Sequence, residues 1–427
     1  MKTANFTTEF GICAMQFPSV FYGLGALRAL RDLTHGKKVL VVSDESCIKA
    51  GALALSHIAV CDTVILDESA KANEKVVAQV RQSICECNVV VAIGTKTIVD
   101  IVRAAAYYEN VLYIVVATAP SSSSFVSEYA DIWIETVKKK IHCAPPIAVV
   151  ADTEIFLKSP ATLKSAGIGN LQSLVLEAIE RQAGAMVSPK KKTSEGDESN
   201  EKVPQLVEIQ IALDCFKELN KNSLHSEKGI ESLFLALCAM QLHKESREET
   251  RGKTGSARKL SDLFYANCLA ETRIIEGETL GLAVSFLIEL VEHISSRLRS
   301  KIVLTPLFSF KAWEKKVKEV FPPKIAKKMI HDESRYQTNA PKNRQKRILT
   351  TYAFAANLLK LLASQKLFST WLALYQKEGG ITSYKKLGLT KRHVKNAILF
   401  GKDLSRDFSF LQLASDLNIL TEFIQEI

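Results

Sequence analysis

Short apolar runs and longer amphipathic runs alternate through the first part of the chain. β-Branched and aliphatic residues cluster in the ranges 37–42, 63–66, 89–93 and 112–117, which predict buried strands. Apolar positions recur at helical spacing in the ranges 21–33, 71–85 and 98–108. Strands that alternate with helices of this length predict a doubly wound α/β domain built on a parallel sheet.

The pattern changes after a last predicted strand within residues 145–156. Beyond Ser159-Pro160 nearly every segment has helical periodicity, with breaks at 252–255, 322–323, 339–343 and 379–380. The segment 187–203 is too polar and charged to pack in a core, so it predicts a mobile surface insertion. We therefore expect an α/β domain over residues 1–155 and an all-α domain over residues 156–427.

Small and polar residues follow the predicted strands at their carboxyl ends. The turn Gly94-Thr95-Lys96-Thr97 follows the strand 89–93 and opens the next helix. Backbone N–H groups at a helix N-terminus bind phosphate, and parallel sheets bind ligands beyond the carboxyl ends of their strands. We expect the turns after Val42, Ile93 and Ala117 to face one cleft, which binds a phosphate-bearing ligand.

Asp44 has two interpretations of equal weight. An acid that follows a strand of a nucleotide-binding sheet often accepts a hydrogen bond from a ribose hydroxyl. Asp44 also precedes a predicted helix, where an aspartate caps the first turn and needs no ligand.

Composition indicates a globular protein kept inside the cell. Of its 427 residues 47% are hydrophobic, yet no apolar run reaches the roughly 18 residues of a membrane helix. The N-terminus has no apolar signal core, so we expect a cytoplasmic protein. The nine scattered cysteines are expected to be reduced, buried thiols, since a metal site at Cys85 and Cys87 would need further ligands nearby.

Much of the net charge of +10 lies between residues 311 and 350, where twelve Lys or Arg face four Asp or Glu. Such a run suits nucleic acid, an anionic membrane surface or a phosphorylated ligand. We favour a solvated face of a helical domain, because few aromatic residues are interleaved and no nucleic-acid motif accompanies the charge.

Several short motifs in a fixed order resemble the glycerol-1-phosphate dehydrogenase family, within the group of iron-type alcohol dehydrogenases, glycerol dehydrogenase and dehydroquinate synthase. The motifs are AIGTKTIVD at 92–100, ATAPS at 117–121 with FVS at 125–127, AD at 151–152, GIGNL at 167–171, GSAR at 255–258, EGE at 276–278 and GLT at 388–390. The resemblance implies an N-terminal NAD(P)-binding domain and a C-terminal helical domain, with substrate and a divalent metal between them.

The resemblance also assigns cofactor-binding residues. They are Gly94, Thr95, Lys96, Thr97 and Asp100 in the pyrophosphate turn and its helix, Thr118, Ser121 and Ser127 in the next turn, and Asp44. Two glycines of the family's turn are Ala92 and Lys96 in this chain, and Lys96 puts a cation beside the phosphate. The acid that normally follows the second turn is replaced within Ser122–Ser124.

The family's metal ligands, an Asp and two His, match Asn170, Tyr265 and Glu276, with Phe264 as the alternative to Tyr265 in a loose register. An amide oxygen and a phenol with a pKa of about 10 are weak ligands, so Glu276 alone is competent. We expect the divalent metal to be lost, while NAD or NADP is retained.

Two functions remain open. One is a pseudoenzyme of this family, NAD(P)-binding but with impaired or lost dehydrogenase activity and a binding or regulatory role, which the substituted metal positions favour. The other is an active NAD(P)H-dependent oxidoreductase that interconverts dihydroxyacetone phosphate and glycerol 1-phosphate, or a similar polyol phosphate, in phospholipid metabolism. Arg258 or Lys259 would then supply positive charge near the substrate oxygen, although a surface ion pair is the favoured interpretation of both residues. A sugar-phosphate cyclase is a weaker third interpretation, because it needs the same metal.

The expected partners are a small phosphate ligand and a second copy of the chain in a dimer.

Overall fold

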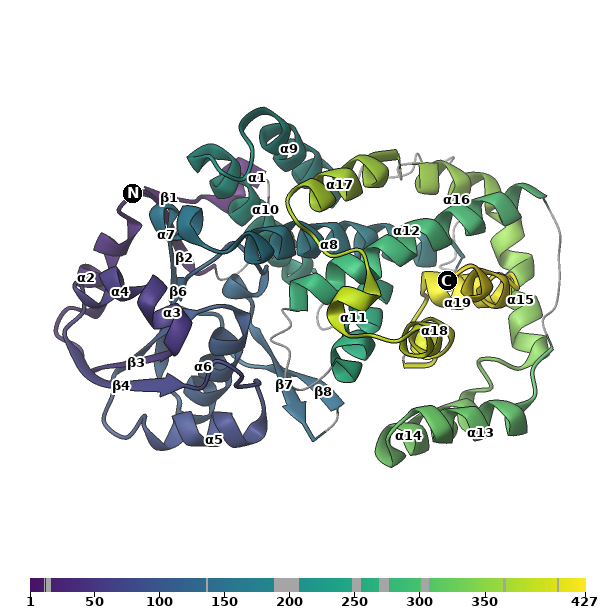
Figure 1. Cartoon of the computed structure of the whole chain (residues 1–427), viewed down its shortest axis with the longest axis horizontal. Coiled ribbons are helices and arrows are strands. Elements are labelled where there is room, and N and C mark those ends of the chain that lie inside the picture. Colours follow the sequence, from purple (N-terminus) through teal and green to yellow (C-terminus); the bar gives the residue numbers. More distant parts are fainter. Residues whose placement is uncertain are drawn as a thin grey trace, which may run out of the picture. The chain divides into compact units, whose positions relative to one another are not determined.

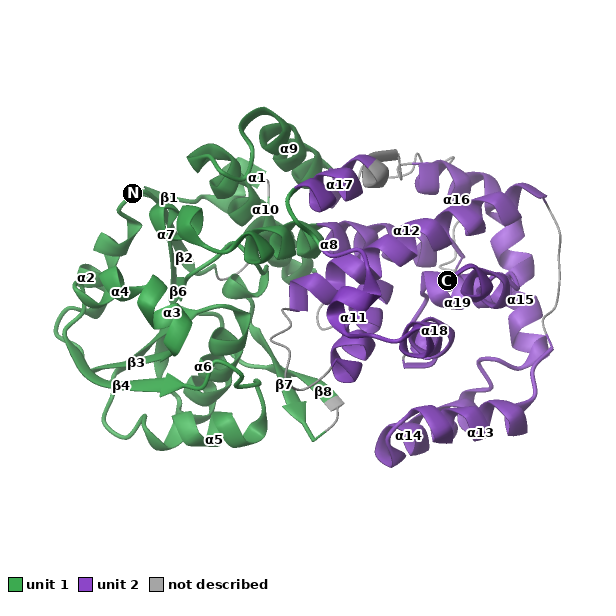
Figure 2. Ribbon diagram, in the orientation of Figure 1, with its two compact units in different colours: residues 1–171, 210–253, 378–380 green, residues 172–209, 254–377, 381–427 purple. Residues whose placement is uncertain are grey.

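The computed structural model describes residues 1–10, 12, 17–135, 137–187, 207–247, 255–268, 276–300, 307–363, 366–404 and 407–427. Apart from Val187, which ends a helix, the insertion predicted at 187–203 lies outside these ranges. The chain forms two compact units (Figure 2). Unit 1 comprises residues 1–171, 210–253 and 378–380, and unit 2 comprises residues 172–209, 254–377 and 381–427.

A seven-stranded sheet forms the centre of unit 1 (Figure 1). Its strands lie in the order β1-β2-β9-β6-β5-β3-β4, and all neighbours are parallel except β1 and β2. The strands are β1 (Lys2–Thr3), β2 (Ser19–Gly23), β3 (Val39–Asp44), β4 (Val60–Leu66), β5 (Val89–Gly94), β6 (Leu112–Ala117) and β9 (Ala148–Asp152). A separate hairpin joins β7 (Tyr129–Ile134) to β8 (Val137–His142).

Helices enclose this sheet because its central strands are apolar on both faces. Every residue of β3, β5 and β9 is buried. The helices of unit 1 are α1 (Phe6–Phe10), η1 (Ala26–Arg28), α2 (Ala29–Thr34), α3 (Glu45–Ala50), α4 (Ala52–Leu55), α5 (Glu74–Gln82), α6 (Lys96–Glu109), η2 (Ser124–Val126), α7 (Thr153–Lys158) and α10 (Glu227–Ser246). Leu27 and Leu30 pack on one face with Val41, Val91 and their neighbours, while α6 contacts β3, β5 and β6. The predicted doubly wound α/β fold is confirmed.

The strand order changes direction between β3 and β5. From β3 the chain passes through α3 and α4 to β4 at one edge, whereas from β5 it passes through α6 to β6 on the other side. The register pairs Ser43 with Ile93 and Gly94 with Ala117, so the carboxyl ends of β3, β5 and β6 are level. Their turns therefore open at one edge of the sheet, where sheets of this type bind ligands.

The N-terminal part differs from the sequence prediction. Residues 21–23 do not start a helix but belong to β2, which pairs with β9 along its length. Gly23 and Gly25 have φ values of 96° and 72°, which end the strand and delay the helix to η1 and α2. The β7–β8 hairpin was also not predicted.

Unit 2 is helical in all of its described elements, which confirms the all-α second part. Two helices, α8 (Ala161–Val187) and α9 (Val207–Asn222), contribute residues to both units. Unit 2 further contains α11 (Ser256–Asn267), α12 (Glu276–Ser300), α13 (Phe310–Val320), α14 (Pro323–Tyr336), α15 (Pro341–Ala353), α16 (Ala355–Leu362), α17 (Lys366–Lys377), η4 (Tyr384–Leu387), α18 (Lys391–Phe400), η5 (Gly401–Leu404), α19 (Phe410–Asp416) and α20 (Leu420–Glu426).

Helix α12 corrects the statement that no apolar run is long enough to span a membrane. Among the described helices, α12 alone is long and apolar enough to span a membrane. However, 72% of its most apolar 18-residue stretch is buried inside the structure. Burial of this extent is that of a core helix.

Cysteine exposure differs in part from the prediction. The eight described cysteines are free thiols. Cys61 and Cys85 are exposed, so the prediction that the thiols are buried is wrong for these two. Cys87 and Cys268 are half-buried, and the prediction is confirmed for the other four described cysteines.

Candidate functional site

Asp44 caps the helix that follows β3. Its Oδ1 accepts hydrogen bonds from the Cys47 backbone N–H at 2.7 Å and from Ser46 Oγ at 2.9 Å. The capping interpretation is therefore observed. A contact between Asp44 and a ribose stays a prediction.

The turn after β5 brings the chain close to helix α6. A Cβ on Gly94 would lie 2.7 Å from Ile98 Cβ and 2.8 Å from Ile98 Cγ1, so a residue with a side chain does not fit there. Thr95 is the N-cap of α6, and its hydroxyl makes no capping hydrogen bond. The first turn of α6, which includes Lys96 and Thr97, thus has no cap from this side chain, an arrangement that suits a phosphate.

The Cys47 thiol links the turns after β3, β5 and β6. Thr118 Oγ1 donates to Cys47 Sγ at 3.7 Å, and the Thr118 N–H donates to the Gly94 carbonyl at 3.3 Å. Burial raises the pKa of Cys47 to about 11, although hydrogen bonds from Thr118 and the Thr95 backbone oppose the shift. The structure therefore brings Asp44, Gly94, Thr95 and Thr118 to one place, as predicted for residues at the carboxyl ends of neighbouring strands.

The side chain of Lys96 extends along its own helix toward Asp100. Its Nζ lies 2.5 Å from Asp100 Oδ2 and 2.9 Å from Asp131 Oδ2 on β7. Only 13% of the Lys96 side chain is exposed. The resemblance predicts that the Lys96 ammonium lies beside a phosphate. In the structure two carboxylates, those of Asp100 and Asp131, hold this ammonium.

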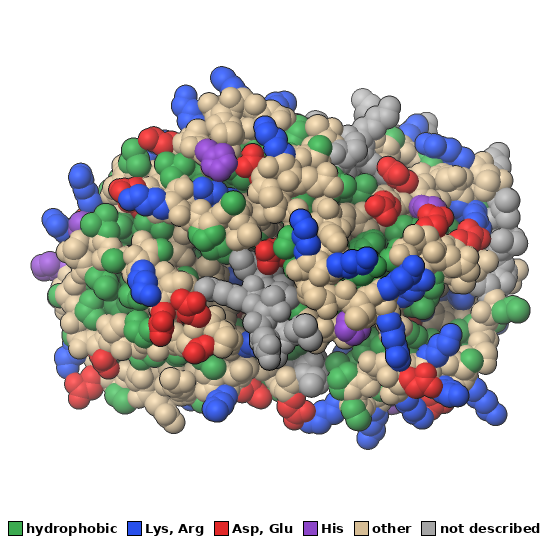
Figure 3. Space-filling view, viewed as in Figure 1, with side chains coloured by type: hydrophobic (Ala, Val, Ile, Leu, Met, Phe, Trp, Pro, Cys, Tyr) green, Lys and Arg blue, Asp and Glu red, His purple; other side chains and the backbone are tan. Residues whose placement is uncertain are grey.

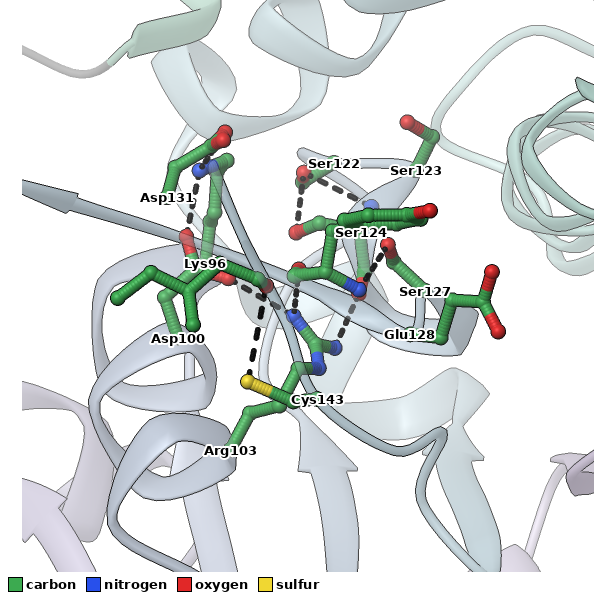
Figure 4. A network of polar contacts seen from close by, with 12 residues as sticks. Lys96, Asp100, Arg103, Ser122, Ser123, Ser124, Ser127, Glu128, Asp131 and Cys143 are labelled. Atoms are coloured by element: carbon green, nitrogen blue, oxygen red, sulfur yellow. Dashed lines mark hydrogen bonds and ion pairs between the residues drawn. The ribbon is translucent and has the colours of Figure 1, made fainter. Parts of the chain in front are cut away.

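Arg103 is a buried residue beside the predicted site that sequence reasoning missed. Figure 4 shows its guanidinium between Asp100 and the serine turn at 121–127. It donates to Asp100 Oδ1 at 2.8 Å, to the Tyr129 carbonyl at 2.8 Å and to the Ser124 carbonyl at 2.5 Å, and its Nε donates to Tyr113 at 2.9 Å. The side chain is fully buried. The available signal was an Asp and an Arg three residues apart in an otherwise apolar helix.

The serine turn is also bound to α10. Ser123 Oγ donates to Gln241 at 3.0 Å, and Ser127 Oγ donates to Glu245 at 2.5 Å. Glu245 further accepts the Glu128 N–H at 3.1 Å, and burial raises the pKa of its carboxyl. Ser121 is buried in the same turn. These contacts fix the backbone of the predicted second cofactor turn.

The metal positions inferred from the resemblance do not offer a suitable donor set. Asn170 is a buried amide on α8, Tyr265 is half-buried on α11, and Phe264, the alternative in the loose register, is fully buried and carries no donor. Glu276 accepts a hydrogen bond from Arg258 Nη1 at 2.5 Å. Across the described ranges, no three His, Cys, Asp or Glu side chains form a group that would hold a metal ion. At the three positions carried over from the resemblance, only Glu276 has a side chain that binds a divalent cation well.

Lys259, the other candidate cation, faces a different carboxylate. It lowers the pKa of Glu180, although burial raises that pKa overall. Glu180 accepts hydrogen bonds from the backbone N–H groups of Ser256 at 2.8 Å and Phe410 at 2.6 Å. Lys259 thus balances a carboxylate that caps the first turns of α11 and α19.

The sequence is similar to known dehydrogenases. A family model described as iron-containing alcohol dehydrogenase matches residues 23–160. The glycerol-1-phosphate dehydrogenase [NAD(P)+] of Geobacillus thermodenitrificans is 27% identical, over 63% of this chain and 68% of the relative. The enzymes of the same name from Saccharolobus islandicus and Bacillus subtilis are 25% and 24% identical. The match covers 70% of the former but only 49% of the latter, about half of its length.

Solved structures extend the likeness over nearly the whole chain. A probable glycerol dehydrogenase from Sinorhizobium meliloti has a TM-score of 0.59 at 15% identity and covers 97% of this chain and 99% of its own. Glycerol dehydrogenase from Schizosaccharomyces pombe has a TM-score of 0.56 at 16% identity, with coverages of 96% and 91%. At such identities these structures establish the fold alone. The chain thus has the fold of the glycerol dehydrogenase structures, and its resemblance to the glycerol-1-phosphate dehydrogenase family, in the iron-containing alcohol dehydrogenase group, is confirmed.

Proposed function

We propose that this chain is an NAD(P)-binding, glycerol-1-phosphate dehydrogenase-like protein that has lost the metal site and, with it, most or all dehydrogenase activity. Its role is then to bind or regulate. Residues 1–155 form the nucleotide domain in this proposal, and residues 156–427 form the helical substrate domain.

The observation that carries the proposal is the ion pair between Arg258 and Glu276. A guanidinium stays charged at any physiological pH, so a cation would have to displace it before it could bind the carboxylate. Asn170 and Tyr265 offer only neutral oxygens at neutral pH. A bound ion supplies a Lewis acid at the substrate oxygen, and without it several kcal/mol of charge stabilisation are missing, which is orders of magnitude in rate.

Retention of the nucleotide is supported by the geometry after β5. The first turn of α6 and the close approach at Gly94 suit a pyrophosphate, and Asp44 lies at the adjacent strand end. In the proposal the remaining contacts come from Thr95, Thr97, Thr118, Ser121 and Ser127. Lys96 and Asp100 contribute by fixing the first turn of α6.

The second candidate, an active oxidoreductase that interconverts dihydroxyacetone phosphate and glycerol 1-phosphate, is supported by the same turn, which keeps Gly94. For either function we propose a homodimer in the cytoplasm that binds a small phosphate-bearing ligand.

Titration with NADH and NADPH tests nucleotide binding. At least one of them should raise the melting temperature, since a ligand bound only to the native state stabilises it by mass action. Gly94→Ala is the matched variant, and its own melting temperature should no longer respond to nucleotide. If neither nucleotide shifts the unmodified protein at millimolar concentration, the nucleotide part of the proposal is wrong.

Assay of dihydroxyacetone phosphate reduction, before and after treatment with a chelator, separates the two candidates. We expect no reduction above background in either state. An ordinary enzymatic rate that survives the chelator supports the active, metal-free enzyme, and a rate abolished by the chelator shows that a metal site persists.

A further inference from the structure

The hairpin formed by α13 and α14 has two chemically different faces. Trp313, Val317 and Phe321 from the first helix and Ala326 and Met329 from the second are buried together, against Phe400 of α18. Because both helices turn their apolar residues toward this cluster, their opposite faces meet solvent.

The solvent faces of the hairpin are basic. The exposed cations are Lys311, Lys315, Lys316 and Lys318 on α13, and Lys324, Lys327, Lys328 and Arg335 on α14. The acids are fewer, and one of them, Glu333, is buried. Blue side chains gather over α13 and α14 at the lower right of Figure 3. Lysines recur at helical spacing, so the charge covers one side of each helix.

A buried polar network holds the hairpin in place. Trp313 Nε1 donates to Asp403 at 3.0 Å, and Asn339 Nδ2 donates to Asp403 at 2.9 Å and to Glu333 at 3.1 Å. Lys402 Nζ donates to Asn339 Oδ1 at 2.6 Å. The basic face is therefore presented on a fixed support.

Four of the twelve basic residues between 311 and 350 lie outside the hairpin, because Lys342, Arg344, Lys346 and Arg347 belong to α15. Arg347 forms a bidentate pair with Asp416, at 2.6 and 2.8 Å, and Arg344 lies 3.3 Å from the same carboxylate. These arginines connect α15 to α19. The charge available to a partner is thus almost entirely lysine.

We propose that the basic face of the α13–α14 hairpin binds the surface of anionic phospholipid bilayers. Lysine ammonium groups are point charges, and laterally mobile lipid headgroups can match any lysine spacing, so no register is required. Trp313 and Phe321 are buried, so the hairpin does not present them as stacking platforms for nucleic-acid bases. Leu307, which is 99% exposed, lies just before α13 and can enter the headgroup layer.

Sedimentation with lipid vesicles tests this proposal on the full chain. We expect binding to vesicles that mix phosphatidylcholine with phosphatidylglycerol, no binding to phosphatidylcholine alone, and loss of binding at high salt. The triple variant Lys315→Glu, Lys327→Glu, Lys328→Glu should bind at least about tenfold more weakly, because three cations of the basic face become anions that the lipid headgroups repel.

The control variant Lys75→Glu, Lys221→Glu, Lys228→Glu makes the same change in net charge at exposed lysines of α5, α9 and α10. It should bind like the unmodified protein, and both variants should keep the unmodified melting temperature. Equal weakening by the two variants would show a net-charge effect and overturn the proposal. Tighter binding to duplex DNA than to anionic vesicles at the same salt, lost in the hairpin variant, would assign the face to nucleic acid instead.

Discussion

Arg258 donates a hydrogen bond of 2.5 Å to Glu276, and this ion pair joins the first turn of α11 to the first residue of α12. Only 11% of the Arg258 side chain and 16% of the Glu276 side chain are exposed. If one member of the pair is removed, the charge of the other stays mostly buried, without its partner and without full hydration.

We therefore expect Arg258→Met and Glu276→Gln each to lower the free energy of unfolding by about 1–3 kcal/mol. The double variant should cost less than the sum, because it leaves neither charge unpaired. Urea unfolding of all four proteins measures the coupling. If the two losses of unfolding free energy simply add, Arg258 and Glu276 are not energetically coupled and the expectation is wrong.

Arg103 should be the most sensitive position in unit 1. Arg103→Met removes four hydrogen bonds and leaves the buried Asp100 without one of its two cations, so we expect a loss of about 3–5 kcal/mol. Arg28→Met, at an exposed arginine, should change stability by no more than about 0.5 kcal/mol. Denaturant unfolding compares the two, and a similar small effect at both positions would contradict the role given to Arg103.

Glu245 should make stability fall as pH rises. Burial raises the pKa of Glu245 in the folded state above its ordinary value of 4.5, so the folded protein holds this proton more tightly than the unfolded chain. Its contribution is most favourable below pH 4.5 and is lost as pH rises through the raised pKa. Glu245→Gln should flatten the stability profile in that window. An unchanged profile would mean that Glu245 is not the titrating group.

The sequence predicts the sheet well because its strands are runs of β-branched residues, as in Val89–Gly94. It misses β2, whose Phe21-Tyr22-Gly23 lacks such a run and pairs with β9 far along the chain. The direction of Lys96 was equally hidden, since Asp131 comes from a hairpin 35 residues away. Arg103 could not be assigned because two of its acceptors are backbone carbonyls, which every residue carries.

The central proposal, that this chain has lost the metal site implied by the family resemblance, is tested most directly by the zinc content of the unmodified protein. Protein incubated with excess zinc and then dialysed against a chelator should retain well below one equivalent per chain, because Arg258 holds Glu276 and the other two positions are neutral. One equivalent of zinc that resists the chelator would contradict the account and restore the metal-dependent enzyme.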